Sequence, residues 1–156
     1  MKKEKKYFAL FLVLIPILIL SCKPNELNMS IIKHNPEGLF PPYRNYSHAV
    51  EVKGNSSLLF ISGLNGYFSD GQTMPENFEE QGELIWQHIG TILKSADMNY
   101  QNVVSIRTYW ADPSYDEANV QLRMKYMGDN QPASTVIVCQ LLEKKWKLEV
   151  EVVAAR

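Results

Sequence analysis

The segment from residue 78 to residue 96, FEEQGELIWQHIGTILKSA, constrains the fold more than any other part of this chain. Asn77 directly before it is a suitable N-cap, and Glu79 and Glu80 favour the positive end of a helix dipole. We therefore predict an amphipathic helix over these residues. Its stripe of apolar and small side chains is formed by Phe78, Gly82, Ile85, Ile89, Ile92 and Leu93.

Apolar segments of strand length lie on both sides of this helix. Residues 47–53, SHAVEVK, and residues 57–64, SLLFISGL, are separated by GNS and predict a β-hairpin. Residues 102–111, NVVSIRTYWA, predict the next strand. Residues 66–77, GYFSDGQTMPEN, between the hairpin and the helix contain several turn-forming residues and predict a loop.

The last third of the chain adds one helix and two strands. Residues 112–128 predict a second helix, with Asp112 as its cap and Pro113 at its first position. Residues 131–154 predict two apolar strands joined by a lysine-rich turn. The order ββ–α–β–α–ββ predicts an α+β sandwich, in which two helices cover one mainly antiparallel sheet.

The final strand carries two carboxylates on a single face. Glu149 and Glu151 alternate with Leu148, Val150 and Val152, so the two glutamates lie about 7 Å apart along one side. A solvated sheet face explains such a pair, and so does a polar functional site. The pattern alone is compatible with both interpretations.

Residues 1–22 have the layout of a secretory signal peptide, with a basic start and an apolar run. The run is shorter than a membrane-spanning helix, and Pro16 interrupts it. Its ending, ILSC, resembles a bacterial lipobox, in which Cys22 becomes the lipidated first residue. An ordinary signal peptide and an uncleaved anchor are the alternatives. We expect an exported protein, anchored by lipid at a membrane of the bacterial cell envelope.

After this segment we expect a tether over residues 23–42, which contains four prolines, and one domain over residues 43–156. Without the leading MKKEKK the chain has 12 basic and 16 acidic residues, which gives no support to a nucleic-acid partner. With Cys22 acylated, no internal disulfide is possible, and Cys139 is expected to be a small core residue.

Common catalytic motifs are missing from the sequence. It has no glycine-rich phosphate loop, no G-x-S-x-G turn and no paired cysteines. The histidines at positions 34, 48 and 88 do not have the spacing of metal ligands. We therefore predict neither a metal site nor a cofactor.

Several segments together resemble the Rid family of reactive intermediate deaminases, also called YjgF. They run in order between residues 43 and 154: YSHAV, LLFISGLNG, the block from NFEEQ to TYWAD, QPAS and LEVEVVA. The resemblance implies a chorismate-mutase-like fold and a homotrimer whose sheets form a central barrel. It also implies three clefts for a small molecule, each between neighbouring subunits. Active members hydrolyse imines and enamines to 2-keto acids and ammonia.

The resemblance also assigns candidate site residues. In the family an arginine directly after the P-A pair grips the substrate carboxylate, and this chain has Ser134 there. Tyr46 and Gly63 match the family's tyrosine and backbone glycine, and Glu151 matches the glutamate thought to position the attacking water. Asn119 matches the family's asparagine when one residue is gapped.

The missing arginine has consequences for the ligand. A cleft that holds Glu151 without an opposing arginine is expected to repel carboxylates and to prefer a neutral or cationic ligand. Arg44 is the candidate replacement by position, whereas Arg107 is expected to face a neighbouring subunit or solvent. Two further departures are Val136 at the family's cysteine and Asp97 at the glycine that ends the first helix. Aspartate tolerates a left-handed turn, so the fold survives that change.

Two functions of different classes are compatible with the resemblance to this family. One is a hydrolase for an imine, an enamine or a related C–N bond, and the other is a small-ligand-binding or scaffolding module without catalysis. A domain unrelated to the family, whose strands only mimic its pattern, is a third reading. RNA cleavage, attached to some relatives, has no support from the acidic balance.

Overall fold

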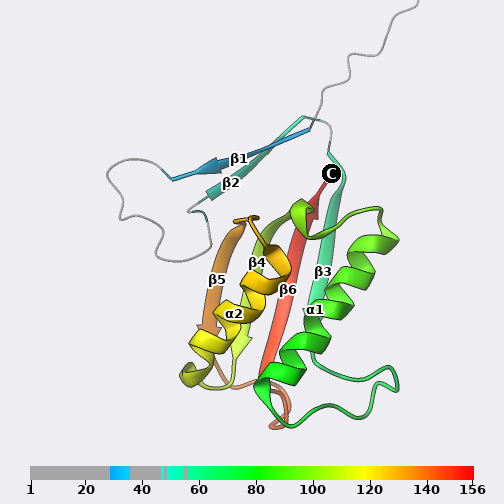
Figure 1. The fold of residues 1–156 in the computed structure, drawn as a ribbon, viewed down its shortest axis with the longest axis vertical. Helices are drawn as coiled ribbons and strands as arrows, with labels where there is room; N and C mark the ends of the chain where they lie inside the picture. The colour runs from blue at the N-terminus through cyan, green and yellow to red at the C-terminus, as the bar shows by residue number, and fades with distance from the viewer. Residues whose placement is uncertain (1–28, 36–46, 48, 55) are drawn as a thin grey trace, which may run out of the picture.

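The computed structural model describes residues 29–35, 47, 49–54 and 56–156. Two helices cover one face of a four-stranded sheet, in which the strands follow the order β3-β6-β4-β5 (Figure 1). Strand β6 is antiparallel to both β3 and β4, and β5 is parallel to β4. This is the predicted α+β two-layer sandwich. Its elements are β3 (Leu58–Leu64), α1 (Phe78–Ser95), β4 (Val103–Trp110), α2 (Asp116–Met127), β5 (Ala133–Val138) and β6 (Leu148–Ala155).

The ends of the helices agree with the predicted caps. The Asn77 side chain accepts a hydrogen bond from the Glu80 N–H at 2.8 Å where α1 begins. Asp97, just beyond the end of α1, has a φ of 54°, which is the predicted left-handed turn. Asp112 caps a short 3₁₀ turn over Pro113–Tyr115 that leads directly into α2. Local sequence signals therefore determine both helix starts.

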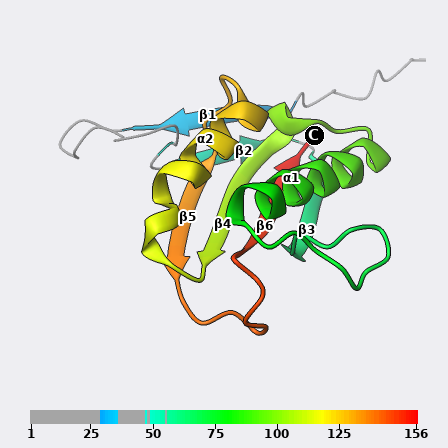
Figure 2. The ribbon, with the colours of Figure 1, turned by 60° about the horizontal axis from the view of Figure 1, so that its bottom comes forward.

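The core lies between the helices and the sheet, and Figure 2 shows both helices on the same side of the strands. Along β6 the side chains of Leu148, Val150 and Val152 are buried in this core, and those of Glu149 and Glu151 are only partly buried on the opposite side. The predicted alternation is confirmed. We call the side of the sheet without helices the open face.

The N-terminal part differs from the prediction. Ser30–His34, inside the predicted tether, form strand β1, which pairs with β2 (Ala49–Lys53) in a separate two-stranded sheet. The predicted hairpin between β2 and β3 is wrong, because β3 pairs with β6 instead. Strand β3 lies at an edge of its sheet, and β2 pairs with β1 instead of with the other side of β3. Residues 1–28 and 36–42, which include the predicted signal peptide and most of the rest of the predicted tether, lie outside the described residues.

Two further features of the described chain bear on the predictions. Cys139 directly follows the end of β5 and is only partly buried, so the expected core position is wrong. Its backbone N–H still donates to the carbonyl of Trp110 at 2.9 Å. Within residues 56–156 and the short stretches before them, no helix has the length and hydropathy needed to span a membrane.

Candidate functional site

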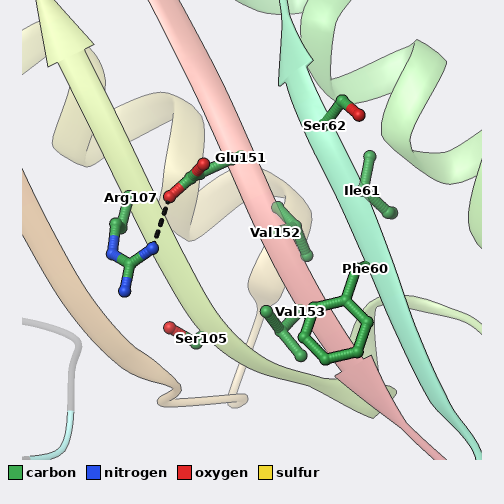
Figure 3. A pocket seen from close by; sticks show the side chains of 8 residues that line it. All are labelled: Phe60, Ile61, Ser62, Ser105, Arg107, Glu151, Val152 and Val153. Atoms are coloured by element: carbon green, nitrogen blue, oxygen red, sulfur yellow. Dashed lines mark hydrogen bonds and ion pairs between the residues drawn. The ribbon is translucent and has the colours of Figure 1, made fainter.

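A pocket of about 310 Å³ lies on the open face of the sheet. Strands β3, β4 and β6 supply its lining, and Figure 3 shows how the side chains are arranged. Phe60 at one end is 72% exposed, so a large aromatic ring lies uncovered beside the pocket. The polar lining residues are Ser62, Ser105, Arg107 and Glu151.

An ion pair fixes the carboxylate of Glu151 in this pocket. Arg107 on β4 and Glu151 on β6 are direct partners in the sheet register, and Arg107 Nη1 donates to Glu151 Oε1 at 2.7 Å (Figure 3). The hydrogen bond to Glu151 raises the pKa of Arg107. The expectation that no arginine opposes Glu151 is therefore wrong, because the pairing of β4 with β6 brings one beside it.

Tyr109 is a second donor on the same face. Its hydroxyl lies 3.4 Å from Glu151 Oε1. Loss of hydration raises the pKa of this phenol, and the nearby charge of Glu151 adds to the effect, so Tyr109 stays protonated and able to donate at neutral pH. Two donors thus orient the carboxylate of Glu151.

Gly63 belongs to the same face, and the side chain that lies over it is that of Glu149. A Cβ placed on Gly63 would lie 1.8 Å from Glu149 Oε1, so a side chain at position 63 would displace the carboxylate of Glu149. Asn65 Nδ2 lies 3.5 Å from the other oxygen of that carboxylate. In this chain, therefore, the carboxylate of Glu149 already occupies the space over Gly63.

We expect Gly63→Ala to lower the free energy of unfolding by about 1 kcal/mol, because the carboxylate of Glu149 must move away from the new methyl group. In a Glu149→Ala background the same substitution is expected to cost nothing, since the clash is gone. Urea denaturation of the wild-type protein, the two single variants and the double variant measures the coupling free energy between positions 63 and 149. Equal costs of Gly63→Ala in both backgrounds would contradict this account.

A second polar cluster lies on the helix-facing side of the sheet, between α2 and β5. Ser134 is in register with Ile106 of β4, a core residue, so its side chain points toward the helices. Ser134 Oγ accepts a hydrogen bond from Arg123 Nη1 at 3.1 Å. Asn119 lies one helical turn before Arg123, and both are buried. We call Asn119, Arg123 and Ser134 the α2–β5 cluster.

The predicted site residues therefore fall into two groups. Gly63 and Glu151 lie on the open face, whereas Ser134 and Asn119 lie on the other side of the sheet. Tyr46 and Arg44 lie outside the described residues. Ser47, which follows Tyr46, is buried and bonded to the segment just before β5: its N–H donates to Pro132 O at 3.1 Å.

Arg123 is the residue that sequence reasoning missed. A signal for it existed, because Arg123 is four positions after Asn119 in a predicted helix and so lies on the same face. An arginine beside buried positions of a helix is uncommon and indicates a specific partner. Among the described residues, no group of three or more histidines, cysteines and acidic residues could hold a metal ion.

Known proteins match this chain in sequence and in fold. The family model described as endoribonuclease L-PSP matches residues 39–156. Reactive Intermediate Deaminase A from the chloroplast of Arabidopsis thaliana is 26% identical over 142 residues, which are 89% of this chain and 72% of that protein. The human 2-iminobutanoate/2-iminopropanoate deaminase is 30% identical over 110 residues, which are 70% of this chain and 78% of that protein.

A solved structure agrees with these matches. The Rid family protein YyfB from Yersinia pestis, described as of unknown function, superposes with a TM-score of 0.71 and 26% identity. The superposition covers 81% of this chain and 98% of that protein. Sequence match, element order and solved structure all agree, and the chain belongs to the Rid/YjgF family, also described as endoribonuclease L-PSP.

Proposed function

We propose that this protein hydrolyses a small imine or enamine in a cleft between neighbouring subunits of a homotrimer, with Glu151 orienting the attacking water. The observation that carries the proposal is the carboxylate of Glu151, held by Arg107 and Tyr109 in a pocket on the open face. The names of the relatives support the reaction class, since several are 2-iminobutanoate/2-iminopropanoate deaminases.

The chemistry needs only water and one positioned base. Glu151 accepts a proton as water attacks the carbon of the C=N bond, and the nitrogen takes a proton to become an amine. Collapse of this intermediate breaks the C–N bond and releases a carbonyl compound and ammonia. The neighbouring Arg107 fixes the direction of the carboxylate through their hydrogen bond, as a positioned base requires.

Two features support an inter-subunit cleft. Within one chain the sheet separates Glu151 from Ser134, so a cleft that uses both needs a second copy. The open face and the β5 edge also expose large apolar side chains, as unpaired interfaces do. The exposed residues are Leu58, Phe60, Val136, Ile137 and Val138.

We expect Glu151→Gln to lower kcat about 100-fold, because the amide keeps the shape but cannot accept the proton from water. The measurement is ammonia release from 2-iminobutanoate generated in situ. Glu149→Gln is the matched control, since it removes the same charge from the same strand face, and it should retain most of the activity. Equal activity of Glu151→Gln and the wild-type protein would refute the assigned role.

A ligand-binding module without catalysis is the second candidate. Its specific support is the engagement of Glu151 by Arg107 at 2.7 Å, together with Ser134 at the position of the family's arginine. In that case the wild-type protein binds a small molecule but releases no ammonia. Gain of hydrolysis by Ser134→Arg would then show that the scaffold still supports the reaction.

A further inference from the structure

The pocket on the open face has an apolar end and a polar end, which the register of three strands determines. Phe60 of β3 and Ser105 of β4 both lie opposite Val153 of β6. Two residues away along β4 and β6, Arg107 lies opposite Glu151. Residues directly opposite in a sheet share a face, and two residues along a strand span about 7 Å. We call Phe60 with Val153 the apolar end and Arg107 with Glu151 the polar end (Figure 3).

The apolar end presents an exposed aromatic ring to the pocket. Phe60 is 72% exposed, whereas Ile61, the next residue of β3, is 5% exposed in the core. Leu58, two residues before Phe60 on the same face, is 51% exposed, so the apolar surface continues beyond the ring. Contiguous exposed apolar surface beside a pocket is typical of a binding site. An apolar group placed over Phe60 would leave water together with the ring, which favours binding.

The polar end keeps hydrogen-bonding groups for a ligand although its two charges are paired. Within the described part of the chain, both side-chain hydrogen bonds to Glu151 end on Oε1, from Arg107 at 2.7 Å and from Tyr109 at 3.4 Å. The second oxygen, Oε2, is thus left for water, and a guanidinium has further N–H groups besides the one used here. The side chains of Arg107 and Glu151 are 60% and 32% exposed, so a small molecule can reach both.

These groups suit an uncharged ligand better than an ion. The charges of Arg107 and Glu151 sum to zero, so a ligand carboxylate meets repulsion from Glu151 and a ligand ammonium meets repulsion from Arg107. The nitrogen of an unsubstituted imine has a lone pair that accepts from an N–H of Arg107, while Glu151 holds the attacking water. The volume of about 310 Å³ is at the small end for ligand pockets and leaves room for one ring beside the C–N group.

We infer that this pocket takes an uncharged imine or enamine with a large apolar substituent, whose C–N group lies at the polar end and whose substituent packs on Phe60. This inference rests on the proposed function and specifies its substrate class. Arg107 then donates to the imine nitrogen and polarises the C=N bond, in addition to orienting Glu151. The expectation from the sequence included a cationic ligand, which the charge of Arg107 disfavours.

The experiment is NMR titration of the purified protein with phenylacetamide, acetamide and phenylacetate, which are stable probes. Phenylacetamide should bind about 10-fold more tightly than acetamide, which has the same polar group but no ring. It should bind about 5-fold more tightly than phenylacetate, which has the same ring but must give up the hydration of its charge. The backbone amide signals of Phe60 and Val153 should shift with phenylacetamide but not with acetamide.

Variants separate the two ends of the pocket. Phe60→Ala should weaken phenylacetamide about 10-fold and leave acetamide unchanged, and Phe60→Leu should recover part of the loss. Arg107→Met should weaken both amides alike, because it acts on the group that they share. Phe68→Ala is the matched control, since it removes another exposed ring that does not line this pocket, and it should change neither affinity. Circular dichroism tests whether each variant folds.

Several results would overturn the inference. They are no binding of phenylacetamide, equal affinity for the two amides, tighter binding of phenylacetate, or signal shifts confined to residues outside this pocket. Loss of an oligomer in Phe60→Ala with unchanged affinity for phenylacetamide would also overturn it, because the ring would then belong to a subunit interface. The shifts in the wild-type protein decide between contact with the ring and an indirect effect of the substitution.

The outcomes also distinguish this inference from the proposed function. The role of Glu151 is tested by kcat at saturating imine, which does not depend on how tightly the substituent binds. A lowered kcat in Glu151→Gln without any preference for the ring would leave only the proposed function standing. A preference for the ring with wild-type kcat in Glu151→Gln would keep the ligand class and refute Glu151 as the base.

Discussion

Trp86→Ala is expected to lower the free energy of unfolding by about 3–5 kcal/mol. Trp86 is the largest of the fully buried side chains, and it lies on the sheet-facing side of α1. Its ring stacks on Tyr126 of α2 at a centroid distance of 5.8 Å and meets Tyr100 edge-on at 6.4 Å. Removing the indole would therefore leave a cavity where both helices meet the sheet. Urea denaturation followed by circular dichroism measures the loss.

Trp86→Phe is the control that separates volume from polarity. The indole Nε1 is buried with no hydrogen-bond partner among the described residues, so phenylalanine removes an unsatisfied donor and keeps most of the aromatic contact. We expect a cost of about 1–2 kcal/mol for this variant. Equal costs for alanine and phenylalanine would show that ring packing is not what Trp86 contributes.

The features that could be predicted from the sequence are those fixed by neighbours along the chain. Asn77 accepts from an N–H three residues later, and Asp97 turns the chain directly after α1. Alternation along β6 places Glu149 and Glu151 on one face because successive side chains in a strand point to opposite sides. Each of these signals acts within a few residues, so no knowledge of the rest of the fold is needed.

The partners of the site residues could not be predicted, since they depend on the order of strands in the sheet. Arg107 and Glu151 are 44 positions apart and meet only because β4 pairs with β6 in this register. A shift of one residue would move Arg107 to the other face. The predicted hairpin is wrong for a similar reason, because β2 pairs with β1 in a separate sheet and β3 pairs with β6 from the far end of the chain.

Element order and the resemblance to the family agree on the fold class, but neither of them points to Arg123. With Ser134 in place of the arginine, nearness in sequence to Tyr46 predicts Arg44 as the replacement, and Arg44 lies outside the described residues. Arg123 is only 11 positions from Ser134, yet their contact requires α2 to pack over β5. A substitution at one position of a site is therefore best judged together with the residues that the fold places beside it.

Gln81→Leu is expected to lower the free energy of unfolding by about 3–4 kcal/mol, because one buried amide connects three backbone groups. Its Nε2 donates to the carbonyls of Pro75 at 2.7 Å and Lys145 at 2.9 Å, and its Oε1 accepts from the Lys147 N–H at 2.9 Å. Leucine fills the volume but satisfies none of these groups. Gln87→Leu, at an exposed position of the same helix, should change stability by less than about 0.5 kcal/mol.

The position of Gln81 gives this variant a second consequence. Pro75 belongs to the loop after β3, which carries Gly63, and Lys147 directly precedes β6, which carries Glu149 and Glu151. Gly66 packs against the backbone of Gln81, so the loop lies close on this residue. Gln81 therefore fixes both segments that lead into the open face, and Gln81→Leu should also lower kcat for 2-iminobutanoate under conditions where the variant is fully folded. A folded variant with wild-type kcat would show that the strands hold the open face without this amide.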